Sequence, residues 1–182
     1  MPPPSPADLS VATLAASPSL APLLRAGSLA PGRYLTTGPR LLPSWFLAAL
    51  SPALRRGGTV LWLDAGNAFD AYGASVFARS AGWDPKELLA RVDLARPFNL
   101  FQLETMVRLK VPRRWRGEPV VVSDPMPLFY DEDVPSAQAR RVLGAVIEAM
   151  DALPAAWLIL AVEREAPPGR AGWLEELARG AE

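Results

Sequence analysis

A candidate phosphate-binding loop runs from Gly38 to Trp45, where the sequence reads GPRLLPSW. The residues on either side predict a strand and then a helix, and this order of elements can bind nucleotide phosphates. Where glycine, lysine and a hydroxyl residue would do the binding, the chain has Pro43, Ser44 and Trp45. Proline donates no N–H, serine cannot reach and neutralise a terminal phosphate, and tryptophan offers Mg²⁺ no hydroxyl. We therefore expect Pro43 to start a helix and Trp45 to fill the space that a phosphate would need.

Two predicted strands lead to aspartates that are further candidate residues. TVLWLD ends at Asp64, and Asp124 directly follows PVVVS. Asp124 could coordinate Mg²⁺, or it could hydrogen-bond neighbouring backbone or pair with Arg40. One carboxylate without a phosphate holds Mg²⁺ poorly, so we favour the structural role. Asp70 precedes a predicted helix, and we expect it to be the N-cap rather than a catalytic acid.

A basic segment reads RLKVPRRWRGE. Cations around an aromatic residue suit phosphate contacts with base stacking, an acidic protein partner, or a solvated connection between elements. All three interpretations stay open. The candidate residues are Arg108, Lys110, Arg113, Arg114, Trp115 and Arg116.

The composition excludes several classes of site. The 182 residues contain no Cys and no His, so thiolate nucleophiles, zinc–sulfur sites and a Ser-His-Asp triad are excluded. The 19 basic and 19 acidic residues cancel, so no global field favours nucleic acid or membrane. No apolar run reaches the length of a membrane span, and the start MPPPSPADLS does not read as a signal peptide. We expect a cytoplasmic protein.

Apolar strands alternate with helices along most of the chain. Such strands indicate a parallel sheet with helices on both faces. We therefore expect a three-layer α/β domain. We expect a Pro/Ala/Leu-rich arm over 1–30, partly flexible or helical, and one domain over 31–182. The predicted strands are 33–37, 59–64, 91–95, 119–123 and 157–162. The predicted helices are 43–54, 69–82, a short one from 85, one from Asn99 to 109, 136–153 and 169–179.

The run GGTVLWLDAGNAFDAYGASVFARSAGWDPKELLARVDLARPFNLFQLETMVRL resembles the core of RecA/RadA-type recombinases and their paralogs. The resemblance covers roughly 32–165, and 58–110 is its specific part. It implies a RecA-like P-loop core with a mainly parallel sheet. It places Gly38 at the first glycine of the Walker A loop and Asp124 at the metal-binding position of Walker B.

Several departures from that family imply a relative that does not hydrolyse ATP. Gly66, behind Asp64, stands where the recombinases have the glutamate that positions the attacking water, and the Walker A residues are replaced. The chain also ends soon after the fifth strand, so we expect a core truncated there.

The counterparts of the two DNA-binding loops differ from strong DNA loops as well. The first carries Asp131, Glu132 and Asp133. The second sets Arg164 and Arg170 against two glutamates. The first also holds an apolar cluster, which is core or, if exposed, a protein contact surface: Met126, Leu128, Phe129 and Tyr130.

The resemblance leads us to expect a non-catalytic RecA-like accessory protein in DNA recombination, repair or the SOS response, without a cofactor. Its partner would be a recombinase, polymerase or repair factor, with DNA contact indirect and a homo- or hetero-oligomer possible. The arm over 7–26 could pack on a neighbouring subunit. One alternative is an ATPase in which Arg40 contacts phosphate and Asp124 holds Mg²⁺. Another is a single-stranded DNA-binding module that uses Arg108–Arg116.

Overall fold

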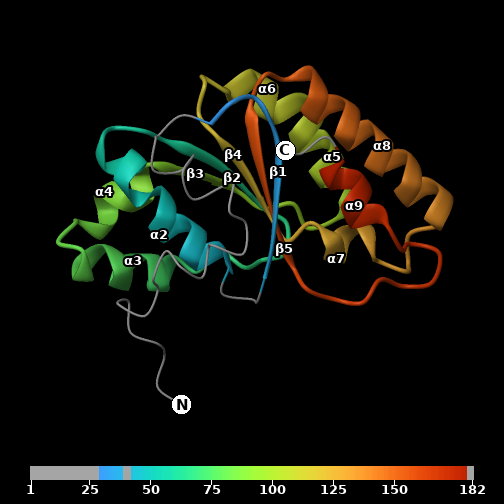
Figure 1. Cartoon of the computed structure of the whole chain (residues 1–182), viewed down its shortest axis with the longest axis horizontal. Coiled ribbons are helices and arrows are strands. Elements are labelled where there is room, and N and C mark those ends of the chain that lie inside the picture. Colours follow the sequence, from blue (N-terminus) through green and yellow to red (C-terminus); the bar gives the residue numbers. More distant parts are fainter. Residues whose placement is uncertain (1–28, 39–41, 180–182) are drawn as a thin grey trace, which may run out of the picture.

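The computed structural model describes residues 29–38 and 42–179, which form a sheet between two layers of helices (Figure 1). All four strand pairings are parallel, and this confirms the predicted three-layer α/β class. The arrangement is consistent with a RecA-like core. In spatial order the strands are β1 (Gly32–Gly38), β5 (Ala156–Val162), β4 (Val120–Ser123), β2 (Val60–Asp64) and β3 (Val92–Ala95).

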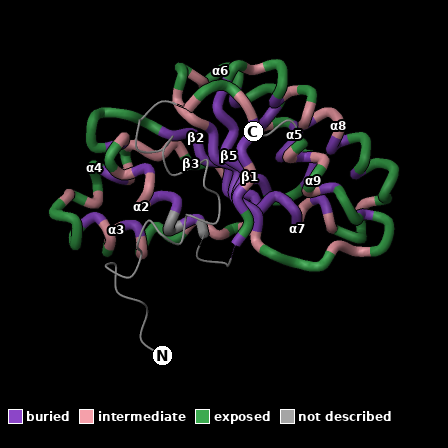
Figure 2. Tube along the Cα trace, viewed as in Figure 1, coloured by how far each residue is buried: buried purple, intermediate pink, exposed green. Residues whose placement is uncertain are grey.

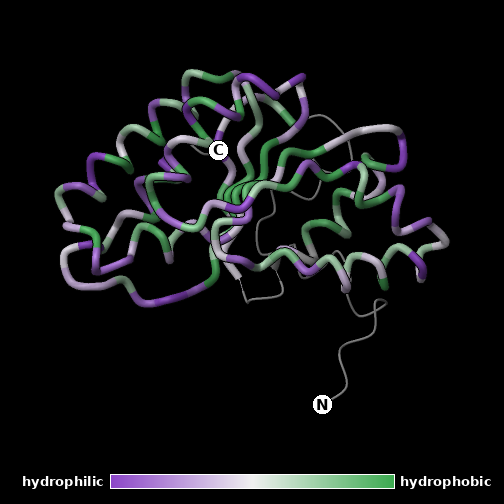
Figure 3. The backbone as a smooth tube through the Cα atoms, turned by 180° about the vertical axis from the view of Figure 1, so that it is seen from behind, coloured by the Kyte–Doolittle hydropathy of each residue, from purple (hydrophilic) through white to green (hydrophobic). Residues whose placement is uncertain are grey.

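The three central strands, β5, β4 and β2, are largely apolar because both faces of the sheet are covered there. Figure 2 shows the resulting buried centre, and Figure 3 shows that its strands are the most hydrophobic part of the chain. Along β2, Trp62 points to one helical layer, whereas Leu61 and Leu63 point to the other.

The first layer contains α2 (Leu42–Arg55), α3 (Ala71–Ser80) and α4 (Pro85–Ala90). The second layer contains α5 (Leu100–Thr105), η2 (Met106–Lys110), α6 (Val111–Arg114), α7 (Met126–Phe129), α8 (Ser136–Ala152) and α9 (Trp173–Ala178). Each layer encloses its own apolar cluster. Phe46, Leu50 and Leu54 of α2 fill the first, whereas Val142, Leu143 and Val146 of α8 fill the second. None of the described helices is long and apolar enough to cross a membrane.

Three helix starts agree with capping signals in the sequence, and these signals are local. Asp70 accepts a hydrogen bond from Gly73 N at 2.9 Å, so its expected role as the N-cap of α3 is confirmed. Asp84 caps α4 and Asn99 caps α5 in the same way.

The helix that begins at Leu100 continues through η2 and α6 to Arg114, beyond its predicted end at residue 109. Its middle is a π-helical turn, in which the Val111 N–H donates to the Met106 carbonyl. Pro112 has no N–H for the Arg108 carbonyl, and its ring would crowd that carbonyl in an α-helix. The wider turn accommodates the proline and lets the helix continue.

Candidate functional site at the carboxyl edge of the sheet

The connections after β2 and β4 leave the sheet on opposite faces. The chain passes from β2 to α3 in the first layer, and from β4 to α7 and α8 in the second. In parallel α/β sheets, ligands bind in the crevice outside the carboxyl ends of two such strands. Asp64 and Ser123 face each other in register at these ends, and Asp124 follows Ser123. The topology therefore brings the two aspartates predicted from the sequence to one edge.

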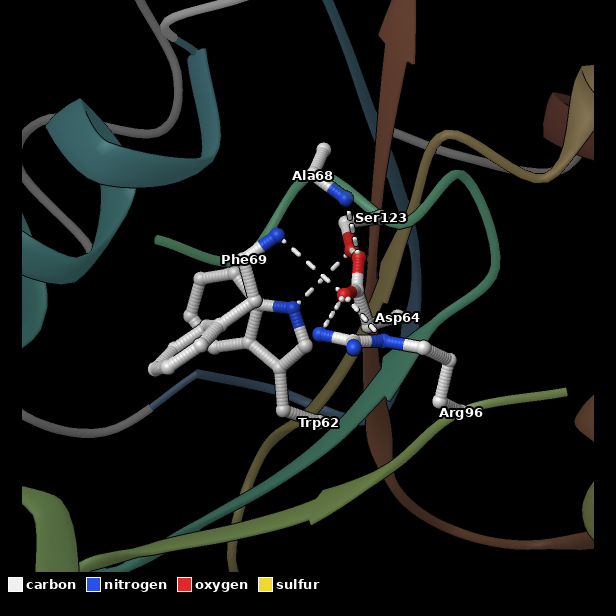
Figure 4. A network of polar contacts seen from close by, with 6 residues as sticks. All are labelled: Trp62, Asp64, Ala68, Phe69, Arg96 and Ser123. Atoms are coloured by element: carbon white, nitrogen blue, oxygen red, sulfur yellow. Dashed lines mark hydrogen bonds and ion pairs between the residues drawn. The ribbon is translucent and has the colours of Figure 1, made fainter. Parts of the chain in front are cut away.

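Asp64 is fully buried, and both of its carboxylate oxygens are hydrogen-bonded (Figure 4). Oδ1 accepts from Ala68 N at 2.8 Å and from the Ser123 hydroxyl at 2.9 Å. Oδ2 accepts from Phe69 N at 3.2 Å and pairs with the Arg96 guanidinium at 2.9 Å. With all these donors around it, the carboxylate holds the chain in place rather than presenting a free base.

Ser123 connects Asp64 to the core. Its hydroxyl donates to Asp64 and accepts from the Trp62 indole N–H at 3.0 Å (Figure 4). The fully buried Trp62 thereby satisfies its only polar atom, and its ring meets Phe69 edge to face with 5.2 Å between centroids. Strands β2 and β4 and the segment after β3 are thus joined through one aspartate.

Asp124 also has an arginine beside it. Its Oδ2 forms an ion pair with the Arg164 guanidinium, which follows β5, and its Oδ1 accepts from Val162 N at 3.3 Å. Its backbone N–H donates to the Leu160 carbonyl at 2.6 Å. Asp124 adopts a left-handed backbone conformation with φ of 49°, which aspartate tolerates better than most residues. The expected backbone bonding is therefore present, whereas the alternative partner Arg40 lies outside the described residues.

Gly66 packs directly against Asp124. A Cβ atom at residue 66 would lie 2.5 Å from Asp124 Cβ and 2.7 Å from its Oδ2. The Gly66 N–H donates to the Ser123 carbonyl at 3.0 Å, which fixes this close approach. A glutamate therefore does not fit at this position unless Asp124 moves.

The candidate phosphate loop is described only in part. Gly38 is buried at the end of β1, and its carbonyl accepts from Glu163 N at 3.2 Å. Pro43 is buried in the first turn of α2, which agrees with its predicted role at a helix start. Arg40 lies outside the described residues, as do the side chains of Ser44 and Trp45. That the indole fills the phosphate space therefore stays a prediction.

The apolar cluster after β4 belongs mainly to the core. Met126 and Phe129 of α7 are buried, so these two cannot form the exposed contact surface that was one of the alternatives. Leu128 and Tyr130 are partly buried against the same core. Burial raises the pKa of the Tyr130 phenol, and Glu175 raises that pKa further.

Arg170 fixes the loop that follows α7. Its buried guanidinium donates to the carbonyls of Phe129, Asp131 and Val134 at 2.6, 2.8 and 2.6 Å. It also lies 5.4 Å from the centroid of the Trp173 ring. Both arginines of the second loop counterpart, Arg164 and Arg170, therefore make internal contacts.

The basic segment lies at the opposite, amino edge of the sheet, because it immediately precedes β4. Arg108 pairs with Glu104 at 3.0 Å and Arg114 pairs with Asp93 at 2.7 Å. Lys110 and Arg113 are exposed, and neither forms an ion pair with another described residue.

The remaining two members of that segment contact their own loop. The Trp115 indole N–H donates to the Glu118 carbonyl at 2.7 Å while its ring packs on the core. The Arg116 guanidinium donates to the carbonyls of Arg113 and Trp115. Trp115 is therefore not positioned as an open stacking platform.

No protein-family model matches the chain, and no curated protein matches it. Within residues 29–38 and 42–179, no three Asp or Glu side chains gather in a group that could hold a metal ion.

Sequence reasoning located Asp64 and Asp124 but did not identify Arg96 and Arg164 as the arginines that pair with them. Arg96 follows β3 directly and Arg164 follows β5 by two residues, so both emerge at the same edge as the aspartates. An arginine placed just after a predicted parallel strand was the available signal. The strand order needed to pair each arginine with its aspartate was not evident from the sequence.

Proposed function

We propose that this chain is a non-catalytic RecA-like protein that acts as a cytoplasmic interaction or accessory factor in DNA recombination, repair or the SOS response. One observation carries the proposal. Both aspartates at the carboxyl edge are bound by arginines of the same chain, Asp64 by Arg96 and Asp124 by Arg164.

These ion pairs oppose nucleotide chemistry at this edge. For Asp124 to coordinate Mg²⁺, its pair with Arg164 would have to break, and the guanidinium would then lie close to a second cation. Gly66 has no side chain that could orient a water molecule. Its close contact with Asp124 leaves no room for a larger side chain at this position. The replaced Walker A residues and the missing water-positioning glutamate support the same proposal as these contacts.

The loop contacts support a protein partner rather than direct DNA contact. Arg170 is buried against three carbonyls and Arg164 faces Asp124, so neither cation is available to a phosphate backbone. The loop between α7 and α8 presents Asp131, Glu132 and Asp133 at the surface, and these acids would repel DNA.

The outer edge of β3 and the adjoining helix offer a surface for such a partner. Phe98 is 78% exposed, and Phe101 and Leu109 of the adjoining helix are exposed as well. Between β3 and this helix, a groove of about 220 Å³ is lined by Leu94, Met106, Lys110 and Arg114, among others. In the recombinases an N-terminal segment of one subunit packs on the core of the next. The arm over 7–26, outside the described residues, is our candidate for that role.

Two measurements test the proposal. We expect no saturable ATP binding at millimolar nucleotide, and we expect the purified protein to bind a RecA-type recombinase or a repair polymerase in a pull-down. ATP hydrolysis that is lost in both Arg40→Ala and Asp124→Asn would overturn the proposal in favour of the ATPase.

The arm and the basic segment are tested separately. Deleting residues 1–30 is expected to change the oligomeric state or partner binding, and an unchanged result would remove the arm from the proposal. Single-stranded DNA binding that falls steeply with salt, and is lost in Lys110→Ala with Arg113→Ala, would instead support the nucleic-acid alternative.

A further inference from the structure

A pocket of about 560 Å³ opens at the amino edge of the sheet, at the opposite end of the strands from Asp64 and Asp124. Its walls include the first residues of β2 and β5, Val60 and Ala156, together with Leu50 and Leu54 of α2. Two turns border it, one at 56–59 and one at 115–118. Its volume lies within the usual range of binding pockets, and its lining combines apolar side chains with Arg56, Arg116 and Glu118. The proposed accessory function makes no use of it.

Leu29, the first described residue, lines this pocket and packs against the core cluster of the first layer. The chain before it reads SLAPLLRAGS over 19–28, which places Leu23 and Leu24 only six and five residues upstream. Five residues span at most about 18 Å when extended, so Leu24 can reach no farther than the neighbourhood of the pocket. A short tether also gives an attached segment a millimolar effective concentration at an adjacent site.

We propose that Leu23 and Leu24 occupy this pocket on their own chain, so that the last part of the N-terminal arm docks in cis. The side chains would cover apolar lining residues that are still accessible, Ala53, Trp115 and Pro154. The driving force is burial of apolar surface, so docking should be insensitive to salt. This inference does not depend on the proposed accessory function, and it leaves only the part of the arm before Leu23 for contact with a neighbouring subunit.

The absence of cysteine from the sequence allows a direct test. Leu24→Cys combined with Thr59→Cys places one thiol on the arm and one at the exposed rim of the pocket. The matched control combines Leu24→Cys with Glu132→Cys, an exposed residue in the loop after α7. With a short bismaleimide, we expect at least ten-fold faster cross-linking within one chain for the first pair, seen as a faster-migrating monomer on a denaturing gel.

Two outcomes of the cross-linking would overturn the proposal. Equal cross-linking rates for the two pairs would mean that the arm does not dock preferentially at this pocket. Cross-linked dimers from the first pair, in place of monomers, would mean that the pocket receives the arm of a second copy.

A second variant tests the apolar contact itself. Leu23→Asp with Leu24→Asp should speed amide exchange at Gly57 and Gly58 several-fold, because the pocket rim would lose its cover. Leu9→Asp, the same change far along the arm, should leave these amides unaffected. Unaltered exchange in the Leu23→Asp, Leu24→Asp protein would contradict the proposal even if ATP and partner assays gave the results expected above.

Discussion

At the residue scale, Asp64 shows how an acidic side chain at a strand end can be structural. Its carboxylate is buried and receives two backbone N–H groups, a hydroxyl and a guanidinium. Removing it would leave these donors buried without an acceptor. Buried donors that lose their partner cost far more than the net value of one hydrogen bond.

We therefore predict that Asp64→Ala lowers the free energy of unfolding by about 3 kcal/mol. Urea denaturation at neutral pH measures this as a lower midpoint with an unchanged slope. Asp93→Ala is the control, because Asp93 pairs with Arg114 at the surface, where the Asp93 side chain is partly exposed and that of Arg114 is exposed. That change should cost less than about 1 kcal/mol. Equal costs for the two variants would contradict the structural role of Asp64.

Gly66 gives a second prediction about a single residue. A Cβ there meets Asp124 Cβ at 2.5 Å, so Gly66→Ala should destabilise the protein by about 1–3 kcal/mol. The control is Gly144→Ala in α8, where an added Cβ meets nothing within 4 Å. Alanine in a helix interior should raise stability by about 0.5–1 kcal/mol. A lower thermal unfolding midpoint for Gly66→Ala and a higher one for Gly144→Ala would support the close packing at Gly66. Higher midpoints for both variants would refute it.

The Tyr130 phenol makes the stability of the folded protein depend on pH in the alkaline range. Burial raises its pKa above the ordinary value of 10.0, so the unfolded chain loses the phenolic proton at lower pH than the folded one. The folded state therefore binds more protons above about pH 10, and its stability falls as pH rises. Tyr130→Phe should make this fall shallower, whereas Tyr72→Phe, at a side chain 77% exposed, should not. The urea midpoint of the unmodified protein and of both variants would be measured at neutral pH and above pH 10. An equal fall of the midpoint in all three proteins would contradict this prediction.

At the element scale, Arg170 determines whether the loop between α7 and α8 is fixed. Arg170→Met keeps much of the side-chain length but removes the donors to three carbonyls. We predict a loss of about 3 kcal/mol, because bonds from a charged donor are worth more than neutral ones. Limited proteolysis should cut the variant within 129–134 much faster than the unmodified protein.

Arg140→Met is the matched control for that prediction. Arg140 is a half-exposed arginine of α8 that pairs with Glu176 and also lies near the Trp173 ring. Its loss should change stability by less than about 1 kcal/mol and leave proteolysis of the loop unchanged. Faster cleavage of this control within 129–134 would show that Arg170 is not specifically responsible.

The elements that the sequence predicted are those with local signals. The caps Asp70, Asp84 and Asn99 each act within their own helix, and apolar runs are sufficient to locate strands. Helix α7 was missed because four residues carry no periodicity, and the turn at η2 was missed because proline usually signals a helix end. Contacts such as Arg170 with Phe129 span 41 residues, so only the folded chain reveals them.

At the scale of the whole molecule, the two ends of the sheet differ in character. Nucleotides bind at the carboxyl edge in related topologies, and here Asp64 and Asp124 at that edge each form an ion pair with an arginine. The amino edge has the larger pocket, and the outer edge at β3 carries exposed aromatic side chains. Of the two described pockets, the larger is therefore away from the edge where a nucleotide would act, whereas Phe98 follows the carboxyl end of β3.

This distribution leads to a prediction about partner binding. Phe98→Glu should abolish binding to the proposed recombinase or polymerase partner, because a buried charge would replace an apolar contact. The side chain is 78% exposed, so the unfolding midpoint should stay the same. Tyr72→Glu is the control, because it places the same charge at an aromatic residue of equal exposure on α3, in the other helical layer. Titration of each variant against the purified partner by calorimetry measures the effect, and equal affinities for the two variants would exclude the β3 edge as the binding surface.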